Sequence, residues 1–120
     1  MKMRTFAAAG IALGMLLIVA GCIYVGNIDP VASVTAVPTT GTTPLPVLFD
    51  ASASVDPDGT IVSYAWDFGD EQTPSSSALA VASHVFTVQS DSEVFRVLLT
   101  VTDNEGASDQ DTVDITVNPL

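Results

Sequence analysis

Apolar and polar residues alternate along most of the chain after residue 30, and short polar segments interrupt the alternation. The clearest stretches are residues 45–50, 61–68, 95–102 and 112–117, with a weaker one at 31–36. Because successive side chains of a strand point to opposite faces, this period of two predicts half-buried β-strands. No window shows the helical period, so the pattern predicts an all-β domain.

The alternation also assigns faces to the two longest predicted strands. In residues 61–68 one face carries Val62, Tyr64, Trp66 and Phe68. In residues 95–102 one face carries Phe95, Val97, Leu99 and Val101, while Leu98 departs from the polar pattern of the other face. We expect both apolar faces to line the core, with Trp66 inside it.

Turn-forming residues separate the predicted strands. Residues 39–44 form a polar turn, Asp56-Pro57-Asp58-Gly59 is a strong turn signal, and residues 104–106 indicate a hairpin. Residues 70–82 are the least regular, and their end, 78–82, is either an edge strand or a covered loop. About seven short strands with such turns predict an antiparallel two-sheet β-sandwich.

The first 21 residues differ from the rest and predict export. Lys2 and Arg4 precede a run without charge from residue 6 to residue 21, as in a secretory signal peptide, expected to be helical. Small residues directly before Cys22 resemble the lipobox of prokaryotic lipoproteins. We expect cleavage after Gly21 and a lipid on Cys22, which would hold the protein on the outer face of a cytoplasmic or outer membrane.

Two alternatives to the lipid anchor stay open. The apolar run could continue to Val25 and span the membrane as a helix of about 20 residues. An ordinary signal peptide cut at Ala20 or Gly21 would instead leave a free thiol. With a lipid on Cys22, residues 22–26 form a tether of at most about 17 Å, so the domain 27–120 would act close to the bilayer.

Charge excludes one class of partner. After residue 21 the only basic residue is Arg96, whereas all 14 acidic residues of the chain lie there. Nucleic-acid binding requires clustered Lys and Arg that displace counterions, so we exclude nucleic acid as a partner. Since 48% of the residues are hydrophobic, the chain has enough apolar surface for a packed core despite its acidity.

Four ordered motifs resemble the polycystic-kidney-disease-type (PKD) domain. They are residues 49–54 (FDASAS), 56–59 (DPDG), 64–70 (YAWDFGD) and 99–106 (LTVTDNEG). The resemblance implies an immunoglobulin-like sandwich that serves as a binding or spacer module outside the cell. Glu71 in place of a glycine, and residues 89–94 in place of a tight turn, depart from the family pattern. His84 falls in a strand position of the family, which implies a structural role.

The same resemblance implies a calcium site. Some PKD-like domains that accompany collagenases bind calcium with acids in the corresponding loop. Matching their ligand positions to this sequence implies a site formed by Asn27, Asp56, Asp58 and Asp103. The backbone carbonyl of Ile28 is a further candidate ligand. Oxygen ligands converging from loops suit Ca²⁺. The alternative is that residues 56–59 only form a turn and Asp103 only caps a hairpin.

Catalysis is not expected. His84 is the only histidine, Cys22 is assigned to the anchor, and no serine motif resembles a nucleophile elbow. We predict a non-catalytic module that binds an envelope protein or a cell-surface glycan. Scarce exposed aromatic residues favour protein. An envelope spacer stiffened by calcium is the alternative, and a hydrolase with acidic loops is the weakest interpretation.

Overall fold

The computed structural model describes residues 16–19 and 22–120, with side chains from residue 26 onward. β1 (Leu16–Val19) and β2 (Cys22–Val25) pair with each other in antiparallel orientation. The predicted signal helix falls mainly on residues 1–15 and 20–21, outside the described residues; its described part is the strand β1. No helix long and apolar enough to cross a membrane occurs among the described residues.

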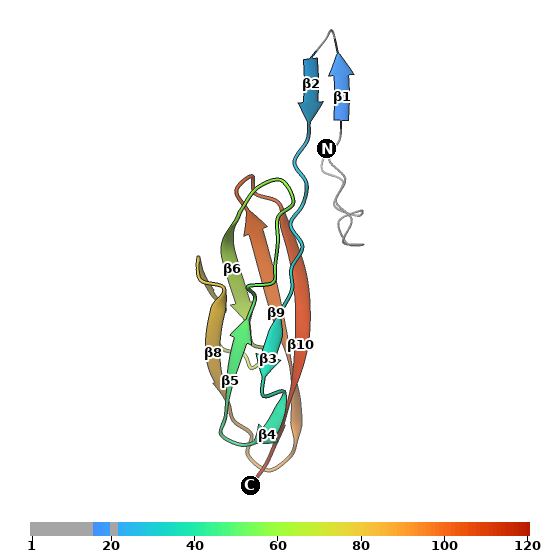
Figure 1. The fold of residues 1–120 in the computed structure, drawn as a ribbon. Helices are drawn as coiled ribbons and strands as arrows, with labels where there is room; N and C mark the ends of the chain where they lie inside the picture. Colours follow the sequence, from blue (N-terminus) through green and yellow to red (C-terminus); the bar gives the residue numbers. More distant parts are fainter. Residues whose placement is uncertain (1–15, 20–21) are drawn as a thin grey trace.

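The rest of the described chain is a two-sheet β-sandwich (Figure 1). The three-stranded sheet has the order β3-β5-β8, and the five-stranded sheet has the order β4-β10-β9-β6-β7. Their bounds are β3 (Thr35–Val37), β4 (Thr40–Thr42), β5 (Leu45–Asp50), β6 (Ile61–Asp67), β7 (Ser75–Ser77), β8 (Val81–Phe86), β9 (Glu93–Asp103) and β10 (Ser108–Asn118). The all-β sandwich predicted from alternation is confirmed, with eight strands rather than about seven.

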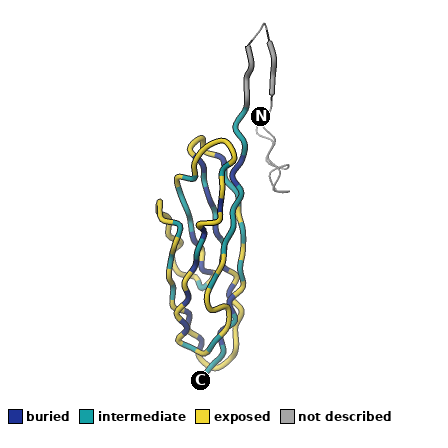
Figure 2. Tube along the Cα trace, in the orientation of Figure 1, coloured by how far each residue is buried: buried dark blue, intermediate teal, exposed yellow. Residues whose placement is uncertain are grey.

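Burial follows the alternation along the central strands (Figure 2). The core comprises Leu45, Val47, Phe49, Ala51, Trp66, Phe68, Phe86, Val88, Phe95, Val97, Leu99, Val101, Ile115 and Val117. Within it, the ring of Phe49 lies 5.7 Å from that of Trp66 and 5.4 Å from that of Phe68, in tilted arrangements. Both the inward face of β9 and the core position of Trp66 are therefore confirmed.

Two details differ from the expectations, and the structure decides the alternative left open for residues 78–82. Val62, predicted to face inward, is half exposed, because a bulge between Ile61 and Ser63 shifts the pairing of β6 with β9 and reverses the faces there. The polar segment expected only as a turn contains β4, which pairs in parallel with β10. Residues 78–80 are loop, and the edge strand β8 begins at Val81.

Side chains rather than a full ladder hold the segment before β3. Val31 forms an isolated bridge with Val55, and the backbone N–H of Ser33 donates to Ser54 Oγ. Two carboxylates of β10 also accept backbone N–H groups: Asp109 Oδ2 lies 2.9 Å from Ala32 N, and Asp111 Oδ2 lies 3.0 Å from Val34 N. These contacts guide residues 27–30 to the end of the sandwich opposite the C-terminus (Figure 1).

Candidate cation site and outer faces of the sandwich

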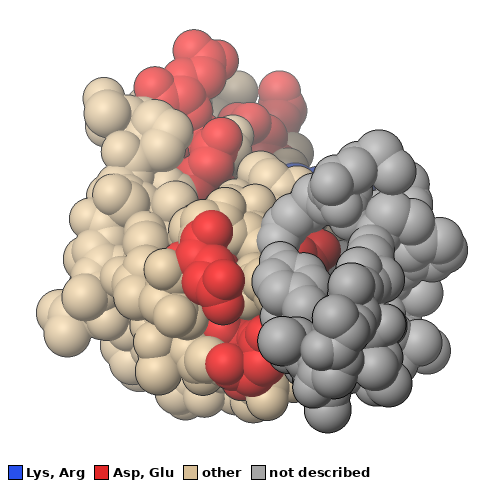
Figure 3. Space-filling model, turned by 90° about the horizontal axis from the view of Figure 1, so that it is seen from above, with Lys and Arg blue, Asp and Glu red and all other residues tan. Residues whose placement is uncertain are grey.

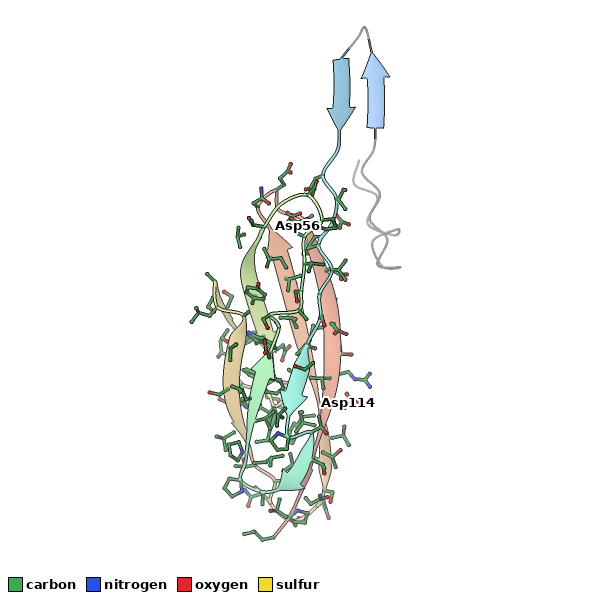
Figure 4. All side chains as sticks on the ribbon, viewed as in Figure 1. Asp56 and Asp114 are labelled. Carbon is green, nitrogen blue, oxygen red and sulfur yellow. The ribbon has the colours of Figure 1, made fainter. Side chains whose placement is uncertain are left out.

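Three segments far apart in the sequence meet at the end of the sandwich where Asp56 lies (Figure 4). Asn27 Nδ2 donates to Asp103 Oδ2 at 2.8 Å, which joins the N-terminal segment to the end of β9. The backbone N–H of Ile28 donates to Asp58 Oδ2 at 2.9 Å, which joins it to the loop before β6. The structure thus brings together Asn27, Asp58 and Asp103, with Asp56 beside Asp58 in the same loop.

The loop 56–59 is a turn closed by Asp56. Its backbone carbonyl accepts the Gly59 N–H at 3.5 Å, and its Oδ1 accepts the Asp58 N–H at 3.4 Å. Asn104 Oδ1 accepts the Thr60 N–H at 3.0 Å, which ties the loop to the β9–β10 hairpin. A Cβ at Gly59 would lie 2.4 Å from Asn104 Oδ1, so this contact requires glycine.

Asp103 connects the hairpin to the N-terminal segment. Its side chain is 1% exposed. Oδ1 accepts the backbone N–H groups of Glu105 at 2.9 Å and Ala107 at 2.8 Å, while Oδ2 accepts Asn27. The predicted hairpin cap is therefore present, and the same carboxylate also faces the candidate site.

Two buried oxygen atoms at this end have no hydrogen-bond partner: Asn27 Oδ1 and Asp56 Oδ2. Burial, together with the nearby charges of Asp58 and Asp103, raises the pKa of Asp56 to about 6. Since a buried acceptor without a partner is costly, both atoms are placed where a cation would be stabilising.

As it stands, the cluster is not closed around a common point. No group of three or more His, Cys, Asp or Glu side chains in residues 26–120 is arranged to hold a metal ion. Asp58 is turned to the Ile28 N–H, and Asp103 is turned to the Asn27 amide. The oxygen ligands suit Ca²⁺ by type, and rotation of Asp58 and of the Asn27 amide would be needed to direct them at one ion.

Two residues that the sequence did not assign to the candidate site also lie at this end of the sandwich. Asn104 bridges to the loop before β6, and Asp29, which is 5% exposed, lies in the same N-terminal segment. The hairpin motif indicated Asn104 as a turn residue only. Its contact with Thr60 depends on the packing of two loops, which no local pattern encodes.

The remaining singled-out residues lie elsewhere. His84 stacks on Phe68, with ring centroids 4.1 Å apart, and its Nε2 lies 2.5 Å from Asp70 Oδ2. These contacts link β8 to the loop after β6, which fits the expected structural role. Cys22 belongs to β2, and its side chain is outside the described part of the chain.

The outward face of the five-stranded sheet presents hydroxyl and amide groups in rows. Register and alternation place Ser63 beside Thr102 and Ser108, Thr100 beside Gln110, and Thr116 beside Thr40 on that face. Gln110 Nε2 donates to Thr100 Oγ1 at 3.2 Å. The charged residues of this face include Arg96 and Asp114, which form a bidentate ion pair. The Arg96 guanidinium lowers the pKa of the Asp114 carboxyl (Figure 4).

The outward face of the three-stranded sheet carries several exposed apolar residues, alongside Thr35, Asp50 and Ser83. Val37 lies opposite Leu48, and Pro46 lies opposite Val85, in the paired strands β3, β5 and β8. Val37 is 71% exposed and Leu48 52%.

Seen from the end that carries Asp56, acidic side chains spread across the molecule and almost no basic atom is visible (Figure 3).

Comparison with known proteins shows which domain family and which solved structures this chain resembles. A model of the PKD domain matches residues 27–117. Over 78% of its length the chain is 38% identical to a structure from a study of the promiscuous specificity of carbohydrate-binding modules of the β-sandwich superfamily, with a TM-score of 0.70. The chain spans only 36% of that protein.

Two solved single domains are similar over almost their whole length. The PKD1 domain of the Vibrio cholerae metalloprotease PrtV is 36% identical over 76% of this chain and 99% of its own, with a TM-score of 0.60. The PKD1 domain of Vibrio anguillarum Epp is also 36% identical, over 78% of this chain and 99% of its own, with a TM-score of 0.62.

Proposed function

The chain belongs to the PKD domain family, and on that premise we propose that it is a non-catalytic binding module tethered outside the cell through a lipid on Cys22. Its ligand is a cell-surface glycan. The observation that carries the proposal is the hydroxyl-rich outward face of the five-stranded sheet, in a chain 38% identical to a structure from a study of carbohydrate-binding modules.

The chemistry of that face suits sugar hydroxyl groups. Thr100, Gln110 and Thr112 offer both donors and acceptors in adjacent positions of two paired strands. Among the described residues, the exposed large hydrophobic side chains include no aromatic ring. Recognition would therefore depend on hydrogen bonds rather than on stacking, and we expect weak affinity for a single sugar and stronger retention on an extended polymer.

Retention of the domain 27–120 on insoluble cell-wall polysaccharides tests the ligand. We expect the double variant Thr100→Ala, Gln110→Ala to bind about tenfold more weakly, a loss of about 1.4 kcal/mol. Ser83→Ala, on the outward face of the other sheet, is the matched control and should bind like the wild type. Equal retention of the double variant and the control, or binding to envelope proteins with no glycan retained, would contradict the glycan proposal.

Intact mass measurement after expression in a bacterium tests the anchor. The small residues before Cys22 support lipidation, so we expect a protein that starts at Cys22 and carries the mass of a diacylglyceryl group. Cys22→Ser should keep the leader uncleaved or release the domain from the membrane fraction. A mature chain with an unmodified thiol would refute the anchor without touching the glycan result.

A second candidate function is a spacer stiffened by calcium, favoured by the unpartnered buried atoms Asn27 Oδ1 and Asp56 Oδ2. Asn27, Asp56, Asp58, Asp103 and the Ile28 carbonyl would hold the ion. When bound, it would supply positive charge that neutralises the acidic cluster and joins the N-terminal segment to the domain. Such a module would keep a fixed orientation relative to its tether.

Thermal unfolding with calcium and with chelator tests that role. Calcium at ten times its dissociation constant should stabilise the wild type by about 1.4 kcal/mol. Asp58→Asn should lose this gain, while Asp91→Asn, an exposed acid before β9, should keep it. A melting temperature that is the same in calcium and in chelator would eliminate the calcium site.

A further inference from the structure

The sandwich has four edge strands, and they differ in length. β3, β4 and β7 have three residues each, and Pro38 directly follows β3. β8 has six residues and pairs with β5 on one side. Beyond its other side no further strand of the described chain lies in the sheet, as Figure 1 shows at the margin of the sandwich.

β8 also lacks the features that usually protect an edge. Its sequence, Val-Ala-Ser-His-Val-Phe, contains no proline, lysine or acidic residue, and no register shift interrupts its pairing with β5. The nearby carboxylate of Asp70 is hydrogen-bonded to His84. Val81 and Val85, on its outward face, are 49% and 53% exposed. The edge is therefore the longest of the four, regular in its pairing, and free of proline, lysine and acidic residues.

We propose that β8 pairs antiparallel with β8 of a second copy of this chain and joins the two three-stranded sheets into one. A partner recognised by charge would favour the acidic surface elsewhere on the domain, whereas this edge matches an uncharged strand of equal length. The chain carries such a strand in β8 itself. A closed twofold pair of identical strands is antiparallel, because each copy then makes the same contacts.

The faces of the sheet limit the register, and the two exposed valines of β8 select one of those that remain. Directly opposite residues share a face, so outward residues of one copy must lie opposite outward residues of the other. The register centred on Ser83 satisfies this condition and sets Val81 opposite Val85 of the second copy. With Leu48 on the neighbouring strand, these side chains gather apolar surface on the outward faces of both copies, around Ser83 at the centre and beside Asp50, which lies opposite Val81.

The same symmetry has a consequence for the tether. The N-terminal segment enters one end of the sandwich and the C-terminus leaves the other (Figure 1). An antiparallel pair therefore places the two Cys22 ends at opposite ends of the dimer. This consequence rests on the proposed anchor and its short tether. With both in place, the pair bridges two facing surfaces rather than joining neighbours in one bilayer.

Disulfide trapping tests the pairing in residues 27–120, which contain the whole core and no cysteine. Isolated PKD1 domains of similar extent have been solved, so this part is a suitable folding unit. Opposed Cα atoms in a strand pair lie about 4.5–5.5 Å apart, within disulfide reach. We expect Ser83→Cys to form a covalent dimer at least fivefold faster than Val94→Cys, an exposed control on β9.

Sedimentation equilibrium supplies a second readout that needs no cysteine. The wild type should approach the mass of two chains as its concentration rises, and Val85→Lys should stay monomeric while Val94→Lys associates like the wild type. Association should strengthen as salt screens the acidic surfaces of the two copies. A monomer at every concentration, equal trapping at positions 83 and 94, or association that weakens with salt would overturn the pairing.

Vesicle clustering tests the bridging geometry without natural lipidation. Residues 22–120 coupled through the Cys22 thiol to maleimide lipids should cluster vesicles at least fivefold more than the Val85→Lys variant, by dynamic light scattering. Unclustered vesicles alongside a trapped solution dimer would overturn the bridging geometry, and a missing lipid on the natural protein would affect only the anchor.

Discussion

The Asp56 carboxylate lies at the acidic end of the sandwich, where burial and neighbouring charges disfavour its ionised form. Its pKa rises from 3.8 to about 6 on folding, since it is partly buried beside Asp58 and Asp103. Folded protein then binds more protons than unfolded protein between about pH 4 and pH 6. The stability that depends on a protonated Asp56 is present below about pH 4 and is lost as pH rises through 6.

In chelator, Asp56→Asn should therefore flatten the fall of unfolding free energy between pH 4 and pH 6 and stabilise the protein at pH 7. Urea unfolding at pH 4.5, 5.5 and 7 measures this, with Asp91→Asn as an exposed control that keeps the wild-type slope. In saturating calcium the same variant should lose the metal-dependent gain. An unchanged slope in Asp56→Asn would refute the assignment of the raised pKa.

Two glycines with positive φ allow the cost of backbone strain in an alanine substitution to be measured apart from the cost of a steric contact. Gly106 has φ +88°, and a Cβ there would meet no atom within 4 Å, whereas at Gly69, φ +75°, a Cβ would lie 2.5 Å from the Arg96 carbonyl oxygen. Gly106→Ala should cost about 1–2 kcal/mol from φ alone, and Gly69→Ala roughly 2–4 kcal/mol. Chemical denaturation of both variants measures the difference; equal losses would contradict the steric contribution.

At the scale of elements, the segment before β3 depends on carboxylates of β10. The Asp109 carboxylate accepts the Ala32 N–H, so Asp109→Ala leaves a partly buried donor unpaired. We expect a loss of about 1–2 kcal/mol and faster hydrogen exchange at the Ala32 amide. Asp91→Ala, which removes an equal charge from an exposed position, should change neither. Exchange at Ala32 that is as slow in Asp109→Ala as in the wild type would argue against this clamp.

Elements differ in how far their local sequence predicts them. β5 and β9 alternate apart from Leu48 and Leu98, which face outward, and the inward residues Val47, Phe49, Val97 and Leu99 are buried as expected. β6 shows the same alternation, yet its bulge exposes Val62, because pairing with β9 rather than periodicity determines the register there. β4 is three polar residues long and is a strand only because β10 supplies its hydrogen-bonding partner.

At the scale of the whole molecule, acidic charge is the dominant surface property. Residues 27–120 carry 14 acidic residues and one basic residue, so the folded domain repels itself. In chelator, raising sodium chloride from about 20 to about 150 mM shortens the Debye length from roughly 20 to 8 Å and should raise the melting temperature. Scanning calorimetry of the domain measures it, and a melting temperature that falls with salt would contradict the repulsion.

Fold class, family and most of the core follow from the order of amino acids alone, because alternation and turn chemistry are local and the four PKD motifs keep their order. The family resemblance also indicated Asn27, Asp56, Asp58 and Asp103. The packed sandwich was needed to show which of these atoms face one another, that Asp56 Oδ2 and Asn27 Oδ1 have no partner, and that β8 is a long open edge. Those properties depend on contacts between residues up to 76 positions apart, which form only when the sheets pack.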